Sequence, residues 1–339
     1  MKKVLIIGPN FFDYTYKIAS VFSKKGYDTF VEIFDDPIHP FKGIMKLKYK
    51  FSFDKEQQKK ISRNNYKCYI EERFEQISPD LVFILNGNIL EITTLDFFRE
   101  TSKVVLWMFD NIKRFPYSAL LVNHIDLFLC FDQSDVDLLR SQGIDAFFLP
   151  QACDINTYYP LLNKDKDIDI LFVGNIYGYE KRKVFLNKII DRFGDCCIIR
   201  FYGIYQYFSK NPLKWLFRPH KNIFFNNVVE PTLVNDLYNR SKIVLNIHHQ
   251  EQKYGANPKV YEICGSGAYQ ICDANPYIEQ LFPNGEIGIY HNEEELFELI
   301  DYALTHDMSE QAERAHQIVV NNHTFVNRIQ QMLNILYSK

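Results

Sequence analysis

The sequence has no stretch of about 18 consecutive apolar residues, the length that a membrane-spanning helix needs. The apolar run at residues 4–7 is too short for the hydrophobic region of a signal peptide, and we expect it to be a first strand. An excess of either charge is also missing, since a net charge of −3 is too small for a general nucleic-acid-binding protein. We therefore expect a cytoplasmic globular protein with no nucleic-acid partner.

Cysteine patterning is absent as well. The seven cysteines are an odd number, no Cys-x-x-Cys pair occurs, and no group of histidines and cysteines has the spacing of a zinc site. Most of the cysteines lie in apolar runs, where a thiol packs as a small hydrophobic group. These features exclude a disulfide framework and predict free thiols in a reducing compartment.

What the sequence does contain is a regular succession of short apolar segments rich in β-forming residues. Most are continuous rather than alternating, which indicates strands buried on both faces and hence parallel sheets. The segments are residues 4–8, 29–34, 81–86, 104–109, 127–131, 146–149, 168–174, 197–202, 223–225, 243–247, 269–272 and 287–290. Helix-like stretches fill the gaps, so the predicted fold class is a doubly wound α/β fold.

The alternation of strands and helices starts again after a break at residues 150–160, which predicts two domains. A polar segment at 164–169 has the character of a surface linker. We place the first domain at 1–158 and the second at 159–322. A separate C-terminal helix is expected in the remaining segment, 323–339.

Residues 255–273 are the most informative stretch. A loop containing glycine and proline is expected to open a short helix that carries Lys259 and Glu262 and breaks at Gly265 and Gly267. The start of a helix presents free backbone N–H groups and the positive end of its dipole, which suits a phosphate. Lys259 would add a mobile positive charge, and Glu262 could accept hydrogen bonds from a ribose diol. The alternative is a turn whose glycines only let a helix pack closely.

The order Gly-Ala-Asn-Pro-Lys-Val-Tyr-Glu at residues 255–262 resembles the donor-nucleotide segment of group 1 glycosyltransferases. It is most similar to the CgeB-like (spore maturation protein) branch, whose usual wording is Gly-x-Asn-x-Arg-x-Phe-Glu. Here Lys259 replaces the usual Arg and Tyr261 the usual Phe. The resemblance implies the GT-B architecture, in which two Rossmann-like domains face each other across a cleft and a C-terminal helix crosses back to the first domain. His-Thr-Phe-Val-Asn-Arg at 323–328 resembles the closing His-Thr-Tyr-x-x-Arg of CgeB-like chains.

The second domain opens with a strand and a turn at Gly174 that resemble the first strand–loop–helix of the family's donor domain. There a Lys or Arg after the turn holds the diphosphate, and Lys181 and Arg182 match it by position; the alternative is a helix with solvated basic residues. Lys259 and Arg182 are expected to be catalytic, because they would stabilise the leaving diphosphate. The donor-binding residues implied by the resemblance are Gly8, Asn10, Gly174, Asn175, Tyr177, Lys181, Arg182, Tyr202, Gly203, Val229, Asn257, Pro258, Lys259, Val260 and Glu262.

The acceptor side is expected in the first domain. The run at 107–111 resembles the Trp-x-x-Asp-x-Pro of CgeB-like chains, although Ile112 follows where Pro is usual. Asp110 is therefore expected to be catalytic, orienting the acceptor hydroxyl or taking its proton. Asn86 and Asn88 would read acceptor hydroxyls at the same rim. The alternative for Asp110 is that it caps the next helix.

One departure from the family pattern bears on the sugar. Group 1 enzymes often carry two glutamates eight positions apart, and the first would fall at Tyr254, which is not an acid. CgeB-like chains commonly lack that first glutamate as well. The run His-His-Gln-Glu at 248–251 could contact the sugar or could be an ordinary surface loop.

The most basic stretch is residues 42–67, where nine Lys and Arg are interleaved with apolar residues. That mixture suits an anionic membrane surface or a lipid-linked acceptor, and a peripheral membrane location is one consequence. The alternative is a solvated helix face beside a loop.

These features together predict a hexosyltransferase-type enzyme of polysaccharide or glycoconjugate biosynthesis. Its donor would be a nucleotide-diphospho-sugar of the UDP or GDP type, and its acceptor a glycan, a lipid-linked glycan or a protein. No further cofactor and no metal are expected, because Lys181, Arg182, Lys259 and a helix N-terminus can neutralise the leaving diphosphate. Three alternatives stay open: a nucleotide-sugar epimerase on the same fold, a non-catalytic nucleotide-binding scaffold, and a lipid- or RNA-binding surface protein.

Overall fold

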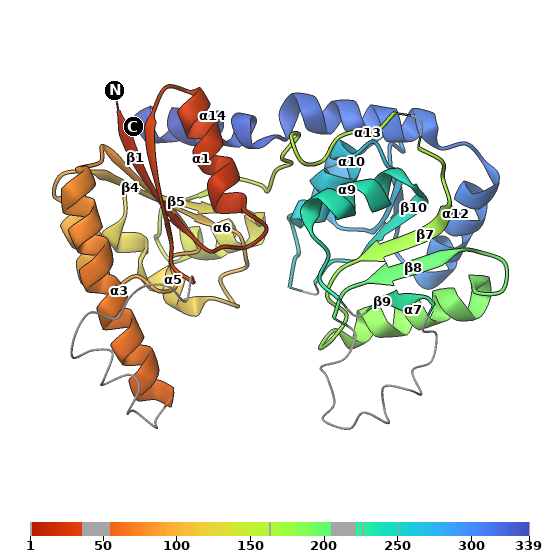
Figure 1. Cartoon of the computed structure of the whole chain (residues 1–339), viewed down its shortest axis with the longest axis horizontal. Coiled ribbons are helices and arrows are strands. Elements are labelled where there is room, and N and C mark those ends of the chain that lie inside the picture. Colours follow the sequence, from red (N-terminus) through yellow and green to blue (C-terminus); the bar gives the residue numbers. More distant parts are fainter. Residues whose placement is uncertain are drawn as a thin grey trace. The chain divides into compact units, whose positions relative to one another are not determined.

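The computed structural model of the chain describes residues 2–35, 55–162, 164–204, 222–225, 227–249 and 251–338 (Figure 1). The chain forms two compact units. Unit 1 comprises Met1–Pro150 and Phe325–Lys339, and unit 2 comprises Gln151–Thr324. The boundaries predicted from the sequence follow residues 158 and 322.

Unit 1 is built on a six-stranded parallel sheet with the strand order β2-β1-β3-β4-β5-β6. Its central strands are continuous apolar runs with almost no exposed surface, which is why they pair in parallel between helix layers. The strands are β1 (Lys3–Gly8), β2 (Asp28–Ile33), β3 (Leu81–Leu85), β4 (Lys103–Met108), β5 (Leu127–Cys130) and β6 (Ala146–Phe148). The helices are α1 (Tyr14–Lys24), α3 (Lys55–Ile77), α4 (Ile92–Arg99), α5 (Pro116–Leu120), the 3₁₀ turn η1 (Val122–His124), α6 (Gln133–Ser141) and α14 (Phe325–Tyr337).

Unit 2 repeats the plan with the strand order β12-β11-β10-β7-β8-β9, again parallel throughout. The strands are β7 (Ile168–Val173), β8 (Ile199–Tyr202), β9 (Phe224–Phe225), β10 (Ser241–Asn246), β11 (Gln270–Asp273) and β12 (Gly288–Tyr290). The helices are α7 (Glu180–Phe193), α9 (Pro231–Asn239), α10 (Pro258–Gly265), α11 (Pro276–Leu281), α12 (Glu293–Thr305) and α13 (Ser309–Asn322). The two sheets confirm the predicted doubly wound α/β class.

The strand order of unit 2 reverses direction at β7. The chain adds β8 and then β9 on one side of β7, and it then returns to place β10 on the other side. In open α/β sheets, ligands bind beyond the carboxyl ends of the strands at such a switch point. By this rule, a ligand of unit 2 is expected at the loops that follow β7, β8 and β10.

The C-terminal helix α14 belongs to unit 1, where it packs against α1 (Figure 1). The ring of Phe325, its first residue, contacts the rings of Tyr14 and Trp107. Arg328 is buried and its Nε donates a hydrogen bond to the carbonyl of Pro150, where the chain leaves unit 1. The segment at which the chain leaves unit 1 is thus hydrogen-bonded to α14, with which the chain returns to unit 1.

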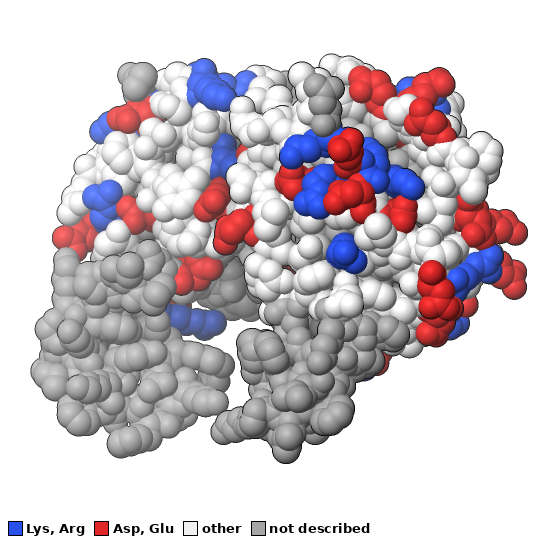
Figure 2. Space-filling view, turned by 45° about the vertical axis from the view of Figure 1, so that its right-hand side comes forward, with Lys and Arg blue, Asp and Glu red and all other residues white. Residues whose placement is uncertain are grey.

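Charged side chains of both signs are interleaved on the face shown in Figure 2. On unit 2, Arg240 pairs with Asp167 and Asp236, and Lys164 also pairs with Asp236. Exposed pairs of this kind contribute little to stability. Of the basic stretch 42–67, for which a membrane contact was expected, residues 42–54 lie outside the described part of the chain.

Candidate functional site

The loops after β7 and β8 approach each other as closely as backbone can. Gly203 has φ of +143°, and a Cβ added there would lie 1.8 Å from the carbonyl oxygen of Gly174. The N–H of Gly174 donates to the carbonyl of Tyr202 at 2.8 Å. Only glycine fits at position 203. Gly174 and Gly203, both expected at the donor site, therefore lie in direct contact at the edge of the sheet.

Helix α10 begins beside this point because Asn257 caps it. The Asn257 side chain accepts a hydrogen bond from the N–H of Val260, and Pro258 occupies the first turn, where no N–H is needed. The Asn257 amide also exchanges two hydrogen bonds, of 3.0 and 3.1 Å, with the amide of Asn246 at the end of β10. The start of α10 is therefore fixed to the carboxyl end of the sheet.

Lys259 lies next to the Gly174 turn. A methyl group placed on Gly174 would be 3.7 Å from Cε of Lys259. No hydrogen bond or ion pair joins the Lys259 ammonium to any other residue in the described part of the chain. Desolvation by surrounding protein lowers the pKa of Lys259, the nearby Arg182 lowers it further, and Glu262 opposes the shift. The side chain as a whole is half-buried, so it is desolvated and still reachable.

Arg182 has a role that the sequence analysis did not foresee. It is buried, and its Nε and Nη2 donate to the carbonyl of Ile247 at 2.9 and 2.5 Å, while Nη1 donates to the carbonyl of Asn175 at 2.8 Å. The guanidinium also lies 4.8 Å from the centre of the Tyr179 ring. Arg182 therefore ties α7 to the loop after β7 and to the end of β10, and it brings its charge close to Lys259.

Glu262 lies one turn after Lys259 on α10 and is 3% exposed. It accepts a hydrogen bond from Tyr158, whose pKa is raised first by burial and then by this carboxylate. Tyr238 on α9 is fully buried nearby and its pKa is raised in the same way. The carboxylate expected to meet a ribose diol is thus already surrounded by tyrosines. Tyr158 carries no sequence signal for this contact, because it lies in the connection between the two units.

The remaining donor-side residues of unit 2 lie around the same edge. Lys181 is exposed, with its ammonium 5.8 Å from the centre of the Phe185 ring. Asn175 and Tyr177 are also exposed, and the N–H of Tyr177 donates to the carbonyl of Ile204. The ring of Tyr202 stacks on Phe225 with 4.7 Å between centroids. Val229 is buried, so only its backbone could meet a ligand.

The expected residues of unit 1 follow its own strand ends. Gly8 ends β1, and a Cβ there would lie 2.4 Å from Oγ1 of Thr15, so the glycine is needed for packing. Asn10 is exposed, and its N–H donates to Asp35. Asn86 has φ of +63° and is buried, with its side chain accepting from the N–H of Phe109.

Asp110 follows β4 and is half-buried, in an ion pair of 2.6 Å with Arg114. The alternative that it caps the next helix is wrong, because α5 starts at Pro116 and its N-cap is Phe115. Asn88 is half-buried, close after the end of β3.

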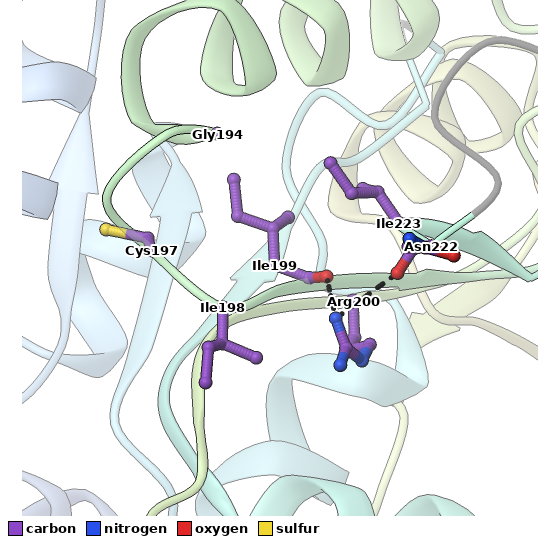
Figure 3. Close-up of a pocket in the computed structure, with 7 residues that line it drawn as sticks. All are labelled: Gly194, Cys197, Ile198, Ile199, Arg200, Asn222 and Ile223. Atoms are coloured by element: carbon purple, nitrogen blue, oxygen red, sulfur yellow. Dashed lines mark hydrogen bonds between the residues drawn. The ribbon is translucent and has the colours of Figure 1, made fainter.

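A separate hollow of about 600 Å³ lies at the amino end of β8 (Figure 3). It is lined by Gly194, Cys197, Ile198, Ile199, Arg200, Asn222 and Ile223. Arg200 donates to the carbonyls of Ile199 and Asn222. The hollow is at the opposite end of β8 from Tyr202, and none of the expected site residues line it.

None of the helices in the described part of the chain is both long enough and apolar enough to cross a bilayer. All seven cysteines are free.

Residues 167–334 match the family model described as Glycosyl transferase-like, which covers most of unit 2 and part of α14. No curated protein sequence matches the chain.

Several solved structures share the whole fold at low sequence identity. A sucrose-phosphate synthase from Thermosynechococcus elongatus is 10% identical with a TM-score of 0.68, and both chains are covered completely. Anabaena HepE, solved with UDP-glucose, is 14% identical with a TM-score of 0.64 over 100% of both chains. A glycosyltransferase from Rickettsia africae is 13% identical with a TM-score of 0.67, covering 99% of this chain and 98% of that one. The whole chain therefore has the GT-B fold of these glycosyltransferase structures, and residues 167–334 match the glycosyl transferase-like family model.

Proposed function

We propose that the protein transfers a hexosyl group from a nucleotide-diphospho-sugar, with the diphosphate held between Lys259, the start of α10 and the Gly174 turn. The observation that carries the proposal is the position of Lys259. Its ammonium has no partner among the described residues, yet it lies beside the closest approach of two loops at the switch point of the sheet. HepE, which shares this fold, was solved with UDP-glucose, so UDP-sugars are the first donors to test.

The proposed chemistry breaks the bond between the anomeric carbon and the diphosphate oxygen and forms one to an acceptor oxygen. Negative charge then accumulates on the leaving diphosphate. A fixed ammonium and the N–H groups of a helix start are the groups that stabilise such charge, and they gain most where water is excluded. Because these groups come from the protein, we propose that transfer does not require a metal ion.

In this proposal the residues around Lys259 contact different parts of the donor. Arg182 positions the Gly174 loop and adds positive potential, and Lys181 is available to reach the diphosphate from the exposed start of α7. Asn175, Tyr177, Tyr202, Gly203 and Val229 line the nucleoside side, and Asn257 with Pro258 and Val260 presents the N–H groups of α10. Glu262 meets the ribose through one of its two oxygens while Tyr158 occupies the carboxylate from the other side.

Unit 1 supplies the acceptor side in this proposal. Gly8 and Asn10 would approach the donor phosphate. Asp110, paired with Arg114, takes the proton of the acceptor hydroxyl, and Asn86 and Asn88 shape the rim. The proposed acceptor is a glycan, a lipid-linked glycan or a protein.

We place this reaction at the cytoplasmic face of a membrane, with residues 42–67 on anionic lipid. The support is the nine cations of that stretch together with seven free thiols, which suit a reducing compartment.

The deciding experiment has two stages. A thermal-shift panel of UDP, GDP, ADP, CMP and dTDP is expected to show one nucleoside diphosphate that raises the melting temperature. Release of that nucleotide from matching sugar donors is then measured with and without mixed glycan acceptors. Release that depends on acceptor supports transfer. Donor conversion without acceptor would identify an epimerase, and binding without turnover a scaffold.

A further inference from the structure

The ends of β10 and β11 bring together a histidine, a cysteine and an aspartate. Asn246 pairs with Cys272 in the sheet register, which places His248, just past β10, against the end of β11. His248 Nδ1 is 2.8 Å from Oδ1 of Asp273 and 3.6 Å from Sγ of Cys272. The Cys272 sulfur is 4.0 Å from the same Asp273 oxygen. Within the part of the chain that the structure describes, no other three His, Cys or acidic side chains come together this closely.

We propose that these three side chains form a binding site for a thiophilic divalent cation of the Zn²⁺ type. Zinc lies about 2.0–2.3 Å from nitrogen, oxygen and sulfur ligands, so tetrahedral ligand atoms are about 3.2–3.6 Å apart. The nitrogen–sulfur distance already has this value, and the other two differ from it by about half an ångström. The donor set is the argument for the ion: sulfur and imidazole suit Zn²⁺, whereas Mg²⁺ and Ca²⁺ take oxygen ligands.

The hydrogen bonding of His248 leaves room for this ion. Its ring is held by the protein only through Nδ1, because Nε2 is buried and has no hydrogen-bond partner among the described residues. An ion at Nδ1 would replace the hydrogen bond to Asp273. Oδ1 of Asp273 would keep the hydrogen bond that it accepts from the backbone N–H of His248 at 2.8 Å.

Access to the ion is from the side of Asp273. The side chain of Asp273 is 18% exposed, whereas that of His248 is 2% exposed. A water molecule would complete a four-coordinate site from that side. The ion would link the ends of β10 and β11 next to Ile247, whose carbonyl accepts a hydrogen bond from Arg182. No step of sugar transfer passes through it, so the site can be tested without a donor or an acceptor.

Spacing along the sequence does not show this cluster. His248 and Cys272 are 24 positions apart on separate strands, which is unlike a short zinc motif. The cluster exists only because the sheet places the two strands side by side.

The test is titration of the full-length protein with Co²⁺ under reducing conditions after removal of metals by a chelator. One Co²⁺ per chain is expected, with a sulfur-to-cobalt charge-transfer band that Zn²⁺ abolishes by displacement. Cys272→Ser should remove the band, and His248→Gln should weaken Co²⁺ binding at least about tenfold. Circular dichroism establishes that each variant is folded.

A matched control is required because another cysteine pair could bind the probe. Cys196 and Cys197 have their sulfurs 3.6 Å apart, and Cys196 is exposed. In a Cys196→Ser/Cys197→Ser background the band should persist. The proposal is overturned if wild type shows no band, or if the band vanishes in this background and survives Cys272→Ser. If Cys272→Ser does not fold, native mass spectrometry with Zn²⁺ replaces that variant. The wild-type protein and the Cys196→Ser/Cys197→Ser protein are each expected to bind one Zn²⁺. No bound ion in the Cys196→Ser/Cys197→Ser protein would overturn the proposal.

Discussion

Lys259 is the residue on which the proposed chemistry depends most. Its ammonium lies beside the Gly174 turn without a protein partner in the described residues, which leaves its charge for a ligand. We expect Lys259→Ala to lower kcat/KM at least tenfold, which is about 1.4 kcal/mol or more of transition-state stabilisation. Initial rates with the donor identified by thermal shift measure this effect.

A matched lysine on the same unit serves as the control for that loss. Lys188 on α7 is exposed and pairs with Glu293, so Lys188→Ala should leave kcat/KM within about twofold, as expected for a surface pair. An unchanged rate in Lys259→Ala, or an equal loss in both variants, would remove Lys259 from the reaction.

The lowered pKa of Lys259 also predicts a pH dependence. Burial disfavours the charged ammonium, so the protonated fraction falls as pH rises through a pKa below that of an ordinary lysine. A bound diphosphate favours the charged form, so binding takes up protons in that window and affinity declines as pH increases. Calorimetric titration of the nucleoside diphosphate across alkaline pH should show the decline.

Arginine at the same position separates this titration from others. Lys259→Arg keeps its charge at all accessible pH values, because a guanidinium does not lose its proton in this range. The alkaline decline should therefore be absent or shifted upward in Lys259→Arg. Identical pH profiles for the two proteins would show that another group titrates.

Helix α10 is the element that joins the sequence signal to the site. Its start was predictable, because Asn-Pro before an apolar run is a helix-opening pattern and glycines end it. Its attachment to β10 through Asn246 was not predictable, since that contact depends on the pairing of two amides from separate elements. Removing the Asn257 side chain therefore tests both the capped start of α10 and its attachment to β10.

We expect Asn257→Ala to lower the free energy of unfolding by about 2 kcal/mol. Loss of the cap contributes about 1 kcal/mol, and the buried Oδ1 of Asn246, which loses its donor, contributes a similar amount, while Nδ2 of Asn246 keeps its hydrogen bond to Gln270. Nucleotide affinity should also fall, because the start of α10 is no longer fixed. Urea unfolding and nucleotide titration measure the two effects.

Asn292 provides the control at the start of α12, where its side chain accepts from the N–H of Glu295. Asn292→Ala should cost about 1 kcal/mol of stability and leave nucleotide affinity unchanged. Equal effects of the two variants on affinity would mean that the fixing of α10 has no part in binding.

Arg182 links three elements, and its removal should be costly. The carbonyls of Ile247 and Asn175 would lose a charged donor, so Arg182→Met is expected to lower the free energy of unfolding by about 3 kcal/mol. By contrast, Arg192→Met, which removes an exposed pair with Asp301, should cost less than about 1 kcal/mol. Comparable urea midpoints for the two variants would contradict a stabilising role of the Arg182 hydrogen bonds.

The limits of the sequence are clearest in this part of unit 2. The basic residues after the Gly174 turn were found by position, but which of the two is buried depends on how α7 packs. Arg182 faces inward and Lys181 outward, which the periodicity of a short helix start does not fix. The contact of Tyr158 with Glu262 joins residues from a connecting segment and a helix, so no local pattern reveals it.

At the scale of the whole molecule, the alternation of apolar runs was enough to predict two parallel sheets, because strands buried on both faces have few polar residues to obscure them. The exact boundary between the two units was harder to predict from the sequence. The segment 150–160 is irregular throughout, and the contacts of Pro150 with Arg328 that mark the end of unit 1 come from opposite parts of the sequence.

Unit 1 is discontinuous, and this predicts the effect of a truncation. A chain ending at Thr324 keeps all of unit 2 but loses the four buried apolar side chains Phe325, Ile329, Met332 and Leu336 from unit 1. At about 1.5–3 kcal/mol for each buried side chain, the loss is comparable to the whole stability of a domain. Unit 1 is therefore expected to be unfolded in the truncated protein, while unit 2 still melts cooperatively.

Tryptophan fluorescence can follow unit 1 alone, because the chain has two tryptophans and Trp107 is the one in unit 1. In a Trp215→Phe background, the buried Trp107 should emit at short wavelength in the full chain and shift to the red after truncation at Thr324. Removing only Ser338 and Lys339 should leave the emission unchanged, because these residues follow the end of α14. A truncated chain whose Trp107 stays buried would show that α14 is dispensable for unit 1.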